Sequence, residues 1–181
     1  LSVIDRTVTG AGGRLLAARL AAPLTDPGAI RTRLDAVGFF AGDGRLRDDL
    51  RARLRAMPDM ERALTRLTLG RGGPRDLGAV RDGLGVAREV RGLLSPAGSS
   101  PGSTAALPGE IAAAVDGLGE HGAAIDRLDR ALADELPLVS RDGGFVRAGF
   151  APELDELPQA HRRAAGALRR RDRHQFAQDP P

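Results

Sequence analysis

Cysteine, lysine, tryptophan and tyrosine are all absent from this sequence of 181 residues. Without cysteine, the chain can form neither disulfides nor metal sites with cysteine ligands. All 27 basic residues are arginine, so a phosphate loop that depends on lysine is excluded throughout the chain. Aromatic residues make up only 3% of the sequence. The core must therefore be aliphatic, and such a composition favours helices over sheets.

Long apolar runs are also missing. No stretch of about 18 apolar residues occurs, so we expect no membrane-spanning segment. The N-terminus lacks the basic, apolar and small-residue order of a signal peptide, which favours a cytoplasmic location. The sequence starts with leucine and not methionine, which suggests a piece of a longer protein. Its length fits one domain, with or without a tail.

Charge is unevenly distributed along the chain. Residues 1–91 carry 17 arginines and 11 acidic residues, whereas residues 92–181 carry a net charge of −3. The basic half could face a polyanion such as nucleic acid. A solvated surface of mixed sign is the simpler interpretation of the same pattern.

Apolar residues recur at helical spacing along almost the whole chain, as in Leu46, Leu50 and Leu54. Helix starts are indicated by Asp26 before Pro27, by Pro58 before Asp59, and by Pro74. Residues 95–108 are rich in serine, proline and glycine, and residues 136–151 read as irregular. The sequence therefore predicts an all-α fold: a multi-helix core with one long Ser/Pro/Gly-rich internal loop.

The glycine-rich stretch TVTGAGGRLL, residues 7–16, has two interpretations. Backbone N–H groups at a helix start can bind phosphate without lysine. Alternatively, Gly10–Gly13 form a tight turn that lets the following helix pack closely, and this second interpretation is favoured.

Two short motifs match enzyme patterns without the required context. GLGEHG, residues 117–122, fits the dinucleotide pattern, and Asp142 lies about 20 residues further on, but the preceding residues read as helix and not strand. GSSPG, residues 98–102, fits the nucleophile pattern around Ser100, but it lies in the predicted loop. Both are expected to be structural connections.

The remaining polar residues form no recognisable site. His121, His161 and His174 lack the spacing of metal ligands. Asp48–Asp49, Asp134–Glu135 and Asp155–Glu156 read as solvated faces. The densest basic patch has a single aromatic neighbour, Phe176; it consists of Arg169, Arg170, Arg171 and Arg173. We therefore expect no catalytic, cofactor-binding or metal-binding residue in this chain.

Residues 2–37 resemble the start of the helical core domain of the MutS family of DNA mismatch-recognition proteins. The resemblance rests on a DRT-x-T turn, Gly-x-Arg-Leu-Leu, Pro-Leu-x-Asp and Arg-Leu-Asp-Ala-Val. The matching residues are Asp5, Arg6, Thr7, Thr9, Gly12, Arg14, Leu15 and Leu16, then Pro23, Leu24, Asp26, Arg33, Leu34, Asp35, Ala36 and Val37. Residues 58–84 and 134–157 are similar to later parts of the same domain.

Two departures accompany this resemblance. Commoner members of the family have Pro-Met where Gly10 and Ala11 stand. After Leu157 the likeness fades into an arginine run and a Pro–Pro end. Residues 1–157 are thus expected to be a core-domain (domain III) segment, and residues 158–181 a divergent, frayed Arg-rich tail where the clamp-bearing helix would continue.

The resemblance implies a mechanical role. In the family, the core is a lever that connects the mismatch-binding, clamp and ATPase domains. ATP and Mg belong to a domain that this chain lacks, and the Phe-x-Glu element that reads mismatches does not occur in it. This segment is therefore expected to be no enzyme by itself. Its implied partner is mismatched double-stranded DNA, reached through a parent protein that is expected to be a homodimer.

An alternative from a different class stays open. The chain could be a stand-alone Arg-rich helical module that binds nucleic acid non-specifically through phosphates.

Overall fold

The computed structural model describes residues 3–95 and 106–156, and in these ranges the chain is all-α, as predicted. The helices are α1 (Gly10–Ala21), α2 (Pro27–Gly42), α3 (Gly44–Ala56), α4 (Met60–Thr68), α5 (Pro74–Leu94), α6 (Gly109–Gly117), α7 (Gly122–Ala131), the short 3-10 helix η1 (Ser140–Asp142) and α8 (Pro152–Glu156). In the described ranges no strand forms, and Leu132 and Val146 make one isolated antiparallel bridge. Most of the predicted internal loop and all of residues 158–181 lie outside these ranges.

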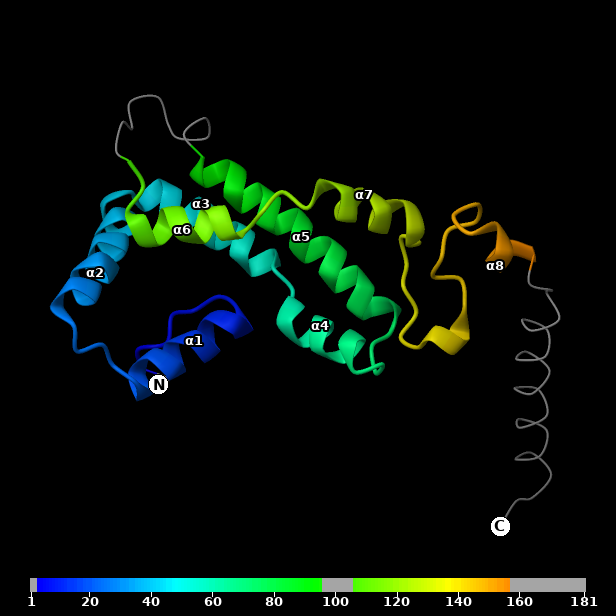
Figure 1. Ribbon diagram of the computed structural model, residues 1–181, viewed down its shortest axis with the longest axis horizontal. Coiled ribbons are helices and arrows are strands. Elements are labelled where there is room, and N and C mark those ends of the chain that lie inside the picture. Colours follow the sequence, from blue (N-terminus) through cyan, green and yellow to red (C-terminus); the bar gives the residue numbers. More distant parts are fainter. Residues whose placement is uncertain (1–2, 96–105, 157–181) are drawn as a thin grey trace, which may run out of the picture.

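The longest described helix, α5, forms the centre of the fold (Figure 1). It packs against α3, α4 and α7, whereas α2 packs against α3 and α6. Within the described residues, no helix is both long and apolar enough to cross a membrane.

Side-chain caps define four of the helix starts. Thr9, Asp26, Asp43 and Asp59 each accept a hydrogen bond from the backbone N–H three residues on, at the start of α1, α2, α3 and α4. Such a cap satisfies one of the backbone donors that a helix start leaves free. The starts predicted at Asp26, Asp59 and Pro74 are confirmed.

The main core is aliphatic and small. Val90 and Leu94 of α5 pack with Ile111 and Val115 of α6, and all four side chains are buried. Phe39 and Phe40 of α2 and the α3 leucines that recur every four residues lie partly buried around them. The core therefore joins α2, α3, α5 and α6.

The glycines of the opening stretch are in a helix and not in a turn, which corrects the sequence-based expectation. Gly10–Gly13 form the first turn of α1, directly after the cap Thr9. A Cβ atom on Gly12 would lie 2.8 Å from Thr9 Oγ1, so glycine leaves room for the capping hydroxyl. The chain bends at Val8 and Thr9, directly before the helix.

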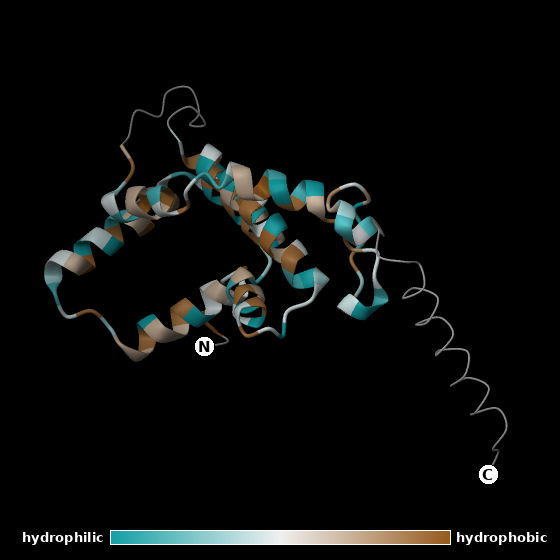
Figure 2. Cartoon of the chain, turned by 45° about the vertical axis from the view of Figure 1, so that its right-hand side comes forward, coloured by the Kyte–Doolittle hydropathy of each residue, from teal (hydrophilic) through white to brown (hydrophobic). Residues whose placement is uncertain are grey.

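Helices α1 and α2 contribute no fully buried residue. Leu15 and Leu20 of α1 are half exposed, and so are Leu34 and Val37 of α2. Figure 2 shows hydrophobic residues along both helices. The two N-terminal helices therefore depend less on burial than α5 does.

Close packing along α5 yields a stability prediction. A Cβ on Gly83 would lie 2.1 Å from Met60 Sδ of α4, whereas a Cβ on Gly85 would meet nothing within 4 Å. We expect Gly83→Ala to lower the free energy of unfolding by about 1 kcal/mol or more, because overpacking exceeds the gain in helix propensity. Gly85→Ala should raise it by about 0.5–1 kcal/mol.

Urea unfolding followed by far-UV circular dichroism measures both changes. Stabilisation by both substitutions would show that α4 and α5 do not approach as closely as described.

Candidate functional site

Three helices begin with an acidic residue that holds an arginine from another helix. These residues are Asp59 at the cap of α4, Asp76 in the first turn of α5, and Glu110 in the first turn of α6. We call the three arrangements the helix-start joints. A carboxylate at a helix start is favoured by the helix dipole, and an arginine can bind the same carboxylate.

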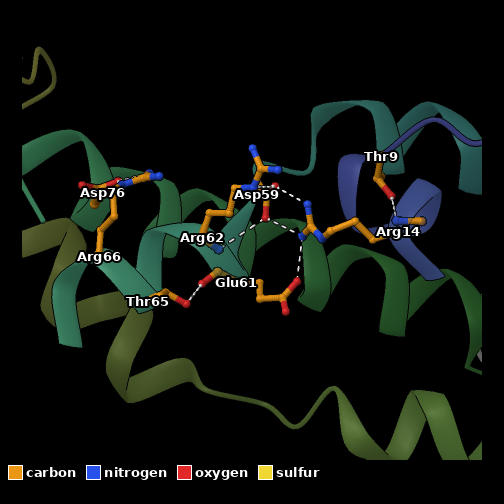
Figure 3. A network of polar contacts seen from close by, with 9 residues as sticks. Thr9, Arg14, Asp59, Glu61, Arg62, Thr65, Arg66 and Asp76 are labelled. Carbon is orange, nitrogen blue, oxygen red and sulfur yellow. Dashed lines mark hydrogen bonds and ion pairs between the residues drawn. The ribbon is translucent and has the colours of Figure 1, made fainter. Parts of the chain in front are cut away.

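The first joint connects α1 to α4 (Figure 3). Arg14 donates to both oxygens of Asp59, at 2.8 and 2.9 Å, and to Glu61 Oε2 at 2.7 Å. Asp59 also accepts from the backbone N–H of Arg62, so one carboxylate caps α4 and fastens α1. This arrangement fixes the direction of α1 as well as its distance from α4.

A glycine makes room for this joint. An ideal Cβ on Gly10 would stand 3.3 Å from Asp59 Oδ2 and 3.5 Å from Arg14 Nη1. Glycine at the first position of α1 therefore lets the carboxylate lie close to the helix backbone.

The second joint connects α4 to α5. Arg66 donates through Nε to Asp76 Oδ1 at 2.9 Å, and its Nη2 group contacts the same oxygen. The other oxygen, Asp76 Oδ2, accepts from the backbone N–H of Gly73 at 2.9 Å, just before α5 begins. Asp76 thus repeats the double role of Asp59 on the next helix.

The third joint gathers α1 and α2 at the start of α6. Arg19 Nη2 lies 3.1 Å from Glu110 Oε1, and Arg33 Nε lies 3.9 Å from the same oxygen. Two arginines therefore share one carboxylate.

Hydrogen bonds from arginine change the titration of both aspartates. The hydrogen bonds from Arg14, followed by the backbone hydrogen bond from Arg62, lower the pKa of Asp59 to about 2. The Arg66 guanidinium likewise lowers the pKa of Asp76. Both carboxylates are therefore ionised at neutral pH.

The joints orient helices more than they stabilise them. Arg14 and Asp59 keep 37% and 28% of their side chains exposed, so solvent screens their attraction. Ion pairs of this kind add little net stability, but a two-pronged guanidinium contact constrains geometry. Because α1 has no buried residue, these contacts help to fix its position against α4 and α6.

The motifs singled out in the sequence lie apart from these joints. GLGEHG joins α6 to α7, with Gly119 and His121 in left-handed conformations, and a helix precedes it where a dinucleotide site needs a strand. Asp142 lies in η1. The GSSPG motif, His161, His174, Phe176 and the arginine patch at residues 169–173 lie outside the described residues.

Asp48, Asp134, Glu135 and Asp155 are exposed, as predicted, and Asp49 is partly exposed. Asp48 and Asp49 pair with Arg47 and Arg45 of their own helix. Asp134 is exposed and pairs with Arg147. Among residues 3–95 and 106–156, no cluster of three histidine or acidic side chains could hold a metal ion.

The joints themselves were missed by sequence reasoning. The capping role of Asp59 is readable from Pro58–Asp59, but Arg14 lies 45 residues earlier in the chain. No local pattern pairs residues at that separation. The only local signal is an acidic residue at the cap or in the first turn of each of three helices.

The fold and the joints together define a helical structural domain, in which arginine–carboxylate contacts set the directions of the helices. The family model described as MutS domain III matches residues 1–178, and the chain belongs to this family. The family expected from the sequence is thus confirmed. The match also includes residues 158–178, which lie outside the described residues, so the boundary at Leu157 stays a prediction.

Two relatives show the extent of the similarity. The DNA mismatch repair protein MutS of Rhodopseudomonas palustris strain BisA53 is 55% identical over 175 residues, and that of strain BisB5 is 52% identical over 175 residues. In both comparisons the aligned region covers 94% of this chain and 18% of the relative. The chain therefore spans less than a fifth of the length of these relatives.

The lowered pKa of Asp59 gives an acid-stability prediction. A carboxyl group with pKa about 2 in the folded chain and 3.8 as its ordinary value stabilises the fold fully above about pH 4. This contribution is lost as the pH falls toward 2. We therefore expect Asp59→Asn to lower the free energy of unfolding above pH 4. The difference in free energy between variant and wild type should become smaller between pH 4 and pH 2.

Urea unfolding at several pH values between 6 and 2 measures this difference. Asp48→Asn is the control, because Asp48 is 75% exposed and its ion pair with Arg47 is 3.7 Å long. It should change stability much less at every pH. If the free energy of unfolding of Asp59→Asn differs from that of the wild type by the same amount down to pH 2, the ionic contact between Arg14 and Asp59 is contradicted.

Proposed function

We propose that this chain is the core, or lever, segment of a longer DNA mismatch-repair recognition protein. Membership of the MutS domain III family and similarity to relatives named DNA mismatch repair protein MutS support this role. In the proposal, the segment connects the parts that bind mismatched double-stranded DNA, clamp it and hydrolyse ATP. ATP and Mg are bound elsewhere in the polypeptide, which acts as a homodimer in the cytoplasm, where it meets the chromosome.

The observation that carries the mechanical role is the contrast between the centre and α1. Helices α3, α5 and α6 share an aliphatic core, which makes a stiff body. Helix α1 is attached to α4 and α6 through Arg14 and Arg19. A helix held in direction by forked ionic contacts can pass a displacement to α4 without breaking the core.

Substitutions in the full-length polypeptide can separate the effect of the positive charge of Arg14 from that of its two-pronged hydrogen bonding. Arg14→Gln removes both, whereas Arg14→Lys keeps the charge and loses the two-pronged contact. We expect mismatched DNA to change the ATPase rate about fivefold less in Arg14→Gln than in the wild type, the lower end of typical coupling between sites. Arg14→Lys should fall in between.

Steady-state ATP hydrolysis with and without mismatched DNA measures this coupling. Basal hydrolysis and DNA affinity should stay unchanged, because Arg14 is assigned to neither site. Arg47→Gln, which removes a surface pair within α3, is the control. Full coupling in Arg14→Gln would refute transmission through the first joint, and loss of basal hydrolysis would indicate a general structural defect.

The chain by itself is expected to lack ATPase activity, because it has no lysine for a phosphate loop. Phosphate release by the purified chain, compared with a boiled control, checks this. Hydrolysis above that control would place an active site within these residues.

A further inference from the structure

A polar pocket lies where the connection between α6 and α7 passes the C-terminal part of α5 (Figure 1). Its volume is about 480 Å³, within the range of about 300–1,000 Å³ that is usual for small-molecule sites. The lining residues are Arg88, Arg91, Gly92, Ser95, Gly119, Glu120 and Gly122. None of them has an apolar or aromatic side chain, so the pocket suits a charged ligand and not an apolar molecule.

Two arginines of α5 give this pocket a positive charge. Arg88 and Arg91 lie three residues apart, so they are neighbours on the helix surface. The side chain of Arg88 makes no ion pair or hydrogen bond with any residue of the described ranges. Arg91 Nη1 lies 3.0 Å from Glu120 Oε1, and the Glu120 side chain is 85% exposed. Two guanidinium groups and one carboxylate therefore line the pocket, which leaves one positive charge uncompensated within it.

The chain that follows α5 supplies no carboxylate to compensate this charge. Residues 96–105 come directly after Ser95 and contain only proline, alanine, glycine, serine and threonine. A guanidinium group has five N–H donors, and Arg91 directs only one of its nitrogens at Glu120. Most donors of Arg88 and Arg91 are therefore available to an external acceptor.

Three glycines line the pocket beside these arginines. A Cβ atom on Gly92 or on Gly122 would meet nothing within 4 Å, so both positions border open space. Gly119 has a φ of 61°, a left-handed conformation that favours glycine. Because these positions have no side chain, a ligand can approach the backbone of α5 and of the connection between α6 and α7 closely.

We propose that this pocket binds a phosphate group between the guanidinium groups of Arg88 and Arg91. Arginine forms two-pronged, charge-assisted hydrogen bonds with phosphate, and phosphate has enough oxygens and charge to engage two guanidinium groups. No aromatic side chain lines the pocket, so a base attached to the phosphate is not recognised by stacking. Free phosphate, a sugar phosphate and the nucleic-acid backbone share this chemistry. The inference goes beyond the proposed function and does not depend on it.

Arginine modification by phenylglyoxal, followed by peptide mass spectrometry, tests the assignment residue by residue. The full-length polypeptide is used without ATP. Inorganic phosphate should slow the modification of Arg88 and Arg91 severalfold, whereas Arg45, which is 84% exposed on α3, should react at an unchanged rate. Potassium chloride at equal ionic strength is the control for screening. If chloride protects as well as phosphate does, or if Arg45 is protected equally, the pocket does not bind phosphate.

Two further probes distinguish the sources of the phosphate group. Ribose 5-phosphate represents a small phosphate ester, and a fully paired DNA duplex represents the nucleic-acid backbone. Protection of Arg88 and Arg91 by phosphate and ribose 5-phosphate at similar concentrations assigns the pocket to small phosphate compounds. Protection by the duplex at much lower concentrations assigns it to nucleic acid. If none of the three probes protects these arginines, the proposal is wrong.

Substitutions of the charged residues have opposite expected effects. Arg88→Gln should abolish the protection of Arg91 by phosphate, because one of the two guanidinium groups is lost. Glu120→Gln should tighten phosphate binding about two- to fivefold, since it removes an exposed carboxylate that repels the ligand. Asp126→Asn, at an exposed position of α7 outside the pocket, should change neither property. Full protection of Arg91 in Arg88→Gln, or weaker binding in Glu120→Gln, would contradict the proposal.

A steric variant leaves the charges in place. Gly92→Leu puts a side chain into the open space of the pocket while keeping Arg88 and Arg91, and it should remove their protection by phosphate. Gly38→Leu is the matched control, because Gly38 is exposed on α2 and also borders open space. Protection that survives Gly92→Leu would place the phosphate outside the pocket and overturn the proposal.

Discussion

One contact organises the arrangement of the helices: a carboxylate at the start of a helix that also binds an arginine from another helix. Asp76 accepts from a backbone N–H with one oxygen and from a guanidinium with the other. Asp59 accepts from Arg14 with both oxygens, and one of them also accepts from the backbone N–H of Arg62. The cap fixes the carboxylate relative to its own helix, so the arginine is fixed as well. Because α4 takes part in two such joints, the direction of α1 is linked through α4 to α5.

Burial and ion pairing hold different parts of the chain in place. The aliphatic cluster between α5 and α6 contains four buried side chains, whereas α1 and α2 contribute partly exposed side chains and charged contacts. Burial is non-directional, and it resists separation of helices more than it sets their angle. Two-pronged arginine contacts set the angle between helices more than they resist their separation. This property suits a segment whose proposed role is to carry movement between other parts of a protein.

The sequence was most informative where signals are local. Apolar spacing and the caps at Asp26 and Asp59 predicted helix type and several boundaries, because both depend on residues within one turn. The glycines at positions 10–13 were misplaced, since glycine is typical of turns and only the neighbouring Thr9 and Asp59 make it necessary at this helix start. The joints could not be predicted, because Arg14 and Asp59 are 45 residues apart and meet only in the folded chain. The family was recognisable because a long ordered pattern of residues carries more information than any short motif.

The exclusive use of arginine determines which solution conditions these joints respond to. Guanidinium groups stay protonated in proteins, and the carboxylate of Asp59 titrates only near pH 2, so physiological changes in pH leave the first joint intact. Its partly exposed position makes it responsive to dissolved ions instead, since the screening length shortens from about 10 Å at 0.1 M salt to about 3 Å at 1 M. The stiffness with which α1 is held is therefore a function of ionic strength and is nearly independent of acidity.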